Sequence, residues 1–64
     1  MTIDNLVMRS LKEIAEKYSN GRVNNVLVKY LEIEELIKRE FVGRDEDWYK
    51  RFALARTRVY FESQ

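Results

Sequence analysis

A chain of 64 residues forms one domain, and a domain of this size buries only about 60% of the surface that its unfolded form exposes. The absence of cysteine and histidine excludes disulfides and removes the usual catalytic base and the commonest metal ligand. Twelve basic and eleven acidic residues give a formal net charge of +1, so no global field draws the protein to nucleic acid or to an anionic membrane.

The composition also bounds location and cofactors. The longest apolar runs, at 6–8, 26–28 and 52–55, are far too short to span a bilayer, and no signal-peptide pattern is present. The lack of cysteine fits a reducing compartment, so we predict a cytoplasmic protein with no membrane partner. Because no loop has a calcium-binding spacing, we expect neither a metal nor a cofactor.

Two glycines, Gly21 and Gly43, divide a proline-free chain into three segments, and each lies where a left-handed residue commonly ends a helix. The first segment predicts a helix over 3–19, with Thr2 as its N-cap and Asp4 in its first turn. Its apolar residues recur every three or four positions, the period of one helical face: Ile3, Val7, Leu11, Ile14 and Tyr18.

The second segment predicts a helix over 24–42 that is capped by an asparagine. Its opening, 26–33, is rich in strand-favouring residues, so a short strand is the alternative there. An acid-before-base pair four residues apart, Glu34 with Lys38, favours the helix. The apolar residues again follow the helical period: Val26, Tyr30, Ile33, Ile37 and Phe41.

The third segment predicts a helix over 45–61, whose first residue is an aspartate that can cap it. Glu46 and Asp47 complement the helix dipole, and they precede Lys50 and Arg51 by four residues, a spacing that predicts two ion pairs. One face of this helix is apolar and is predicted to point inward: Trp48, Phe52, Ala55 and Val59.

Three helices with short connections predict an all-α fold, a compact bundle that dimerisation could complete. The whole of 1–64 would form this single domain. The predicted core takes its residues from all three helices: Val7, Leu11, Ile14, Tyr18, Val26, Tyr30, Ile33, Ile37, Phe41, Trp48, Phe52 and Val59.

Catalysis has little support in the sequence. Without histidine, a nucleophilic serine would need a lysine as its base, and Ser10 with Lys17 is an unremarkable pair of helix residues. The carboxylates that could serve as acid and base are interpreted as solvated helix faces: Glu13, Glu16, Glu32, Glu34 and Glu35. We therefore predict no catalytic residues and a protein that is not an enzyme.

The third helix has more apolar surface than a core requires. Five of the eight aromatic residues lie in 48–61, and Leu54 and Phe61 project nearly opposite the predicted core face, with Tyr49 and Tyr60 on a flank between. Two neighbours rarely enclose a helix that is apolar almost all round. We therefore predict that these four residues bind a protein partner, with a second copy in a homodimer favoured; the alternative is that the helix end folds back onto the same core.

Four arginines form the other candidate contacts. Arg56 and Arg58 have no acid at pairing distance within their helix, and Arg22 and Arg44 lie in the connections. They are predicted to contact the rim of the protein interface or, in an alternative function, DNA or RNA. Residues 11–25 resemble a helix-turn-helix over a short stretch, without a specific motif, so no function is assigned from that resemblance.

The sequence thus predicts a small, non-catalytic regulatory or adaptor protein that acts by protein–protein binding through its third helix and associates with itself. A DNA- or RNA-binding regulator is the alternative.

Overall fold

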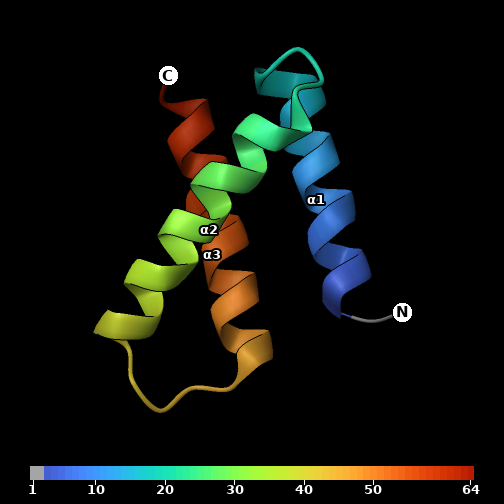
Figure 1. Ribbon diagram of the computed structural model, residues 1–64. Helices are drawn as coiled ribbons and strands as arrows, with labels where there is room; N and C mark the ends of the chain where they lie inside the picture. The colour runs from blue at the N-terminus through green and yellow to red at the C-terminus, as the bar shows by residue number, and fades with distance from the viewer. Residues whose placement is uncertain (1–2) are drawn as a thin grey trace.

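The computed structural model describes residues 3–64 and confirms an all-α fold of three helices (Figure 1). Helix α1 spans Ile3–Tyr18, α2 spans Val23–Glu40 and α3 spans Glu46–Glu62. These bounds differ from the predicted ones by one or two residues. The stretch 26–33 lies within α2, so the strand alternative is wrong.

The helix ends follow local chemistry. Gly21 and Gly43 have φ values of 79° and 97°, in the left-handed region that favours glycine. Asp45 is confirmed as the cap of α3, because its side chain accepts a hydrogen bond from the Trp48 N–H at 2.8 Å. The cap position of α2 is Arg22, which makes no capping hydrogen bond, so the asparagine cap is wrong. The predicted cap Thr2 lies outside the described residues.

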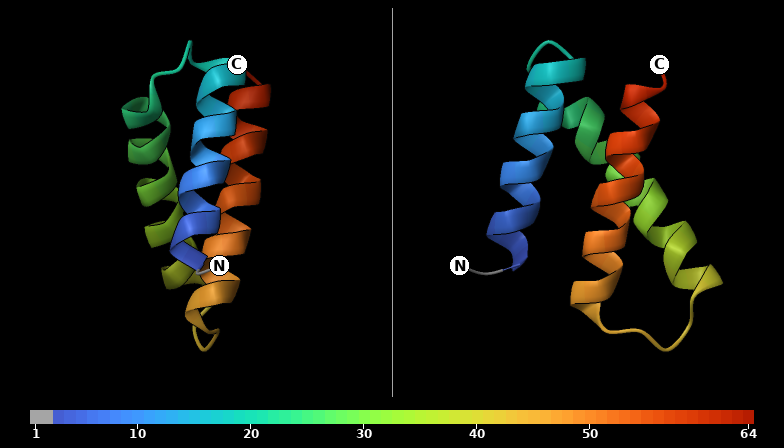
Figure 2. Two further views of the ribbon diagram at one scale, coloured as in Figure 1. Left: turned by 90° about the vertical axis from the view of Figure 1, so that its right-hand side faces the viewer. Right: turned by 180° about the vertical axis from the view of Figure 1, so that it is seen from behind.

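The three helices pack as a bundle in which every pair of helices is in contact. α1 and α3 run side by side in the same direction, and α2 returns across them at an angle (Figure 2). The principal extents are 35 × 28 × 15 Å. Each of the three helices also carries exposed residues.

The core prediction is largely right for α1 and α2. Its confirmed members are buried in the structure: Val7, Leu11, Ile14, Val26, Tyr30 and Ile37. Four further members are half-buried and pack against that core: Tyr18, Ile33, Trp48 and Phe52. The predictions for Phe41 and Val59 are wrong, since 38% and 56% of these residues are exposed. Phe41 lies just beyond the end of α2, and Val59 lies on a flank of α3.

Helix α3 presents a different face to the core from the one predicted. Tyr49, Ala53 and Thr57 are buried at four-residue spacing, whereas Ala55 is exposed. Ala53 and Thr57 have small side chains, and the distance between packed helices depends on the side chains at their contact. The Thr57 hydroxyl donates to the Ala53 carbonyl at 2.7 Å, so burial leaves it paired.

Ion pairs join the helices. Lys50 Nζ lies 2.9 Å from Asp4 Oδ1 and links α3 to α1, so the predicted pair of Lys50 with Glu46 is wrong. Lys38 Nζ lies 3.5 Å from Glu34 Oε1, as predicted, and 3.4 Å from Glu46 Oε2. Lys38 therefore links α2 to α3. Ion pairs at the surface individually contribute little to the free energy of unfolding, so these contacts mainly fix the orientation of the helices.

The raised pKa values of Tyr30 and Lys50 predict that the protein loses stability at alkaline pH. Burial, together with a hydrogen bond to Glu34, raises the pKa of Tyr30 well above its ordinary value of 10.0. The hydrogen bond to Asp4 raises the pKa of Lys50 above 10.5 despite partial desolvation. Above about pH 10 the unfolded chain therefore loses protons that the folded chain keeps, which favours unfolding.

We expect the free energy of unfolding to be constant near neutral pH and to fall above about pH 10, with at most about 1.4 kcal/mol per pH unit coming from Tyr30. Urea denaturation from about pH 8 to about pH 12 measures this slope. Tyr30→Phe removes one of the groups with a raised pKa and should make the slope shallower. An unchanged slope in Tyr30→Phe would show that Tyr30 is not responsible.

Candidate protein-binding face

The large apolar residues of α3 remain at the surface. Trp48 and Phe52 are half-buried and Val59 is 56% exposed, while the smaller Ala53 and Thr57 occupy the core. The more hydrophobic stripe of α3 is therefore only partly covered by the other two helices. This arrangement leaves apolar surface exposed whose burial would stabilise the protein.

A groove runs between α2 and α3 and encloses about 380 Å³. No residue of α1 lines it. Leu36 and Val59 line it with 58% and 56% of their surface exposed, and Tyr60 lines it with 38% exposed. We call it the α2–α3 groove, and its lining residues come from both helices: Ile33, Leu36, Ile37, Glu40, Arg56, Val59 and Tyr60.

From the α2–α3 connection into α3, two arginines flank two aromatic rings at four-residue spacing: Arg44, Trp48, Phe52 and Arg56. We call this set the arginine–aromatic row. The Arg44 guanidinium carbon lies 4.9 Å from the Trp48 ring centroid, and that of Arg56 lies 6.0 Å from the Phe52 centroid. The two ring centroids are 5.0 Å apart. Such contacts hold a guanidinium in place without using all of its hydrogen-bond donors.

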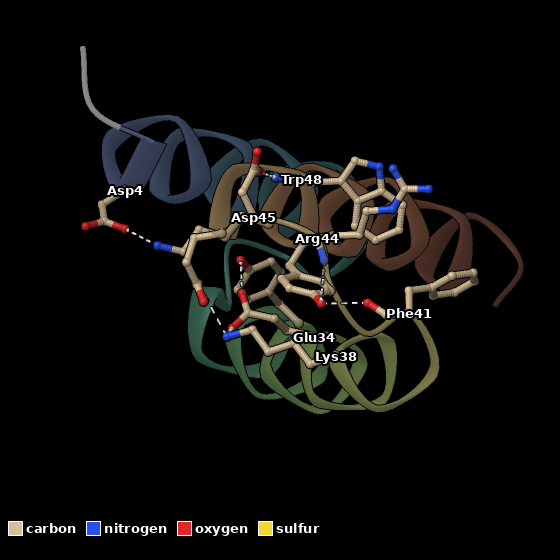
Figure 3. A network of polar contacts seen from close by, with 11 residues as sticks. Asp4, Glu34, Lys38, Phe41, Arg44, Asp45 and Trp48 are labelled. Atoms are coloured by element: carbon tan, nitrogen blue, oxygen red, sulfur yellow. Dashed lines mark hydrogen bonds and ion pairs between the residues drawn. The ribbon is translucent and has the colours of Figure 1, made fainter.

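The connection between α2 and α3 is fastened by one buried side chain. The Tyr49 hydroxyl accepts from the Arg44 N–H at 3.2 Å and donates to the Phe41 carbonyl at 2.6 Å. The Phe41 ring in turn packs against Trp48 and Phe52, with centroid distances of 5.6 and 5.5 Å. Figure 3 shows Arg44 against the Trp48 ring and Phe41 at the other end of this connection. Tyr49 thereby positions one end of the arginine–aromatic row.

The four residues predicted to bind a partner do not form one exposed face. Tyr49 is 7% exposed and belongs to the core. Leu54 and Phe61 are half-buried and pack against the core of the single chain, on the flank of α3 that also carries Lys50, the partner of Asp4 on α1. Tyr60 is exposed and lines the α2–α3 groove. Sequence reasoning missed Leu36, whose position among charged residues of α2 gave no signal.

The four arginines are not gathered into one patch. Arg22 lies in the α1–α2 connection, at the opposite end of α2 from Arg44 (Figure 1). Arg58 Nη2 lies 4.0 Å from Glu13 Oε2 on α1. The arginine–aromatic row brings only Arg44 and Arg56 together, and neither forms an ion pair with a described residue.

Comparison with protein-family models, curated proteins and solved structures finds no match to this chain. Among the helices of residues 3–64, none combines the length and apolar character that crossing a membrane requires. The same residues contain no cluster of three or more carboxylates placed to hold a metal ion.

Proposed function

We propose that this protein is a non-catalytic regulatory or adaptor protein that acts in the cytoplasm by protein–protein binding, and that a second copy of the chain covers its α2–α3 groove. The observation that carries the proposal is the orientation of α3, which buries Tyr49, Ala53 and Thr57 and leaves Trp48 and Phe52 half-buried and Val59 exposed. Leu36 extends this apolar surface across the groove onto α2.

Charge complementarity favours a second copy as the occupant. Between residues 48 and 61 the chain has four basic residues and no acidic one, whereas residues 30–40 of α2 have four acidic and two basic residues. Opposite walls of the groove carry Glu40 and Arg56, which form no ion pair with each other. In a two-fold dimer each contact between an acidic residue of one copy and a basic residue of the other occurs twice, once in each direction across the interface.

Self-association is tested with two leucines of α2. Leu36 lines the groove and Leu31 lies outside it, but the two side chains are similarly exposed, at 58% and 50%. We expect wild-type protein to form a dimer at micromolar concentration in sedimentation equilibrium. Leu36→Ser should weaken the dimer at least tenfold, because burying one leucine contributes about 1.5–3 kcal/mol.

Leu31→Ser is the matched control and should leave the dissociation constant within about twofold, because a loss below about 0.4 kcal/mol is expected outside the interface. Both variants should keep the helix content of the wild type in circular dichroism. A wild-type chain that stays monomeric, or equal weakening by the two substitutions, would contradict the proposal.

A further inference from the structure

The arginine–aromatic row has a counterpart of opposite charge on α2. Glu32, Leu36 and Glu40 follow one another at four-residue spacing, so they lie along one ridge of the helix. We call them the Glu–Leu–Glu row. All three are exposed, and Leu36 and Glu40 line the α2–α3 groove. Glu32 has one partner, Lys29, at 3.0 Å on the surface, a kind of ion pair that is weak and easily exchanged.

The two rows match in the order of their charges. One presents a cation, two aromatic rings and a cation; the other presents an acid, a leucine and an acid. Glu32 and Glu40 lie eight residues apart, about 12 Å along the helix axis. The distances from Arg44 to the Trp48 ring, from that ring to the Phe52 ring, and from the Phe52 ring to Arg56 together limit the separation of the two guanidinium carbons to at most about 16 Å. Ridges of residues four apart are also those that most often interlock between packed helices.

We infer that the arginine–aromatic row of one copy docks against the Glu–Leu–Glu row of the second copy, and that these charges set which surfaces meet. This inference rests on the proposed self-association. Leu36 of the second copy would lie against the rings, and its flanking carboxylates would face Arg44 and Arg56. Two-fold symmetry repeats the arrangement, so each copy contributes both rows.

The structure favours carboxylates over nucleic acid as the ligand of the row. Each guanidinium keeps donors that match a carboxylate in fork geometry. The net charge of +1 supplies no long-range attraction for a phosphate backbone.

Charge reversal tests the docking without knowledge of any other ligand. The first variant, Arg44→Glu with Arg56→Glu, makes both rows of each copy acidic. The second, Glu32→Arg with Glu40→Arg, makes both rows basic. Each variant alone should dimerise roughly a hundredfold more weakly than wild type, because like charges then face each other. An equimolar mixture should recover dimers, since each row again meets its opposite.

The control is Arg22→Glu with Arg51→Glu, which reverses two exposed arginines that lie outside the row and form no ion pair with a described residue. It should dimerise as wild type does, in sedimentation equilibrium with helix content checked by circular dichroism. If a reversed variant loses helix, the corresponding glutamine substitutions replace it, and each should weaken the dimer roughly tenfold.

The outcomes separate the two proposals. Self-association stands if wild type dimerises and Leu36→Ser weakens the dimer. The pairing of the two rows is nevertheless wrong if the charge-reversed variants dimerise normally, or if their mixture stays monomeric. If wild type is monomeric throughout, both are wrong. A wild-type chain that is monomeric but binds a mixed-sequence DNA or RNA probe in a salt-sensitive mobility shift would favour the nucleic-acid alternative.

Discussion

Replacing Ala53 with aspartate is expected to unfold most of the protein. Ala53 is fully buried at the centre of α3, so an aspartate there would place a charge in the core without a partner. The cost is at least about 3 kcal/mol. A domain of this size has a total stability of about 3–10 kcal/mol, so little or none would remain. Urea denaturation followed by circular dichroism measures the loss.

Ala55 supplies the matched control, because it lies two residues away on the same helix and is exposed. Ala55→Asp should cost less than about 1 kcal/mol, mostly from the lower helix propensity of aspartate. The pair of substitutions directly tests the rotation of α3, since the most hydrophobic stripe of the sequence would have placed Ala55 inside. If Ala53→Asp were tolerated and Ala55→Asp were not, α3 would face the core with its other stripe.

Replacing Tyr49 with alanine should destabilise the protein by about 3–5 kcal/mol, as removal of a large buried ring generally does. Tyr49→Phe separates the contribution of the hydroxyl from that of the ring. It leaves the Arg44 N–H and the Phe41 carbonyl without their partner and should cost about 1–3 kcal/mol. Urea denaturation gives both values, and faster amide hydrogen exchange at Arg44 in Tyr49→Phe would report loosening of the connection.

Tyr60 is the control for this hydroxyl. It is 38% exposed and its hydroxyl makes no hydrogen bond with any described residue, so Tyr60→Phe should change stability by less than about 0.5 kcal/mol. Equal effects of the two phenylalanine substitutions would mean that the Tyr49 hydroxyl does not hold the connection. In that case Arg44 would also lose its fixed place at the end of the arginine–aromatic row.

Both predictions bear on binding as well as stability. Ala53 and Tyr49 occupy the inward stripe of α3, and their burial leaves Trp48 and Phe52 only half-buried beside it. The tether from Tyr49 fixes Arg44 relative to those rings. The proposed interface is therefore a direct consequence of how the core is packed, and a variant that loosens Tyr49 should weaken self-association together with stability.

Much of the fold could be predicted from the sequence because its determinants are local. The spacing of Val7, Leu11 and Ile14 specifies one face of α1, and that face is the buried one. Gly21 and Gly43 end stretches of helix because they adopt positive φ values at little cost. The number, order and approximate bounds of the helices follow from such signals.

The face that α3 turns inward was decided only by the tertiary structure. Hydrophobicity favours the stripe of Trp48, Phe52 and Val59, yet Tyr49, Ala53 and Thr57 are buried instead. The tether of Tyr49 to the connection and the small size of Ala53 and Thr57 select that face, and both depend on where α1 and α2 lie. The four residues predicted to bind a partner do not share one exposed face for the same reason: a helix with two apolar stripes has no local signal that says which of them its neighbours will cover.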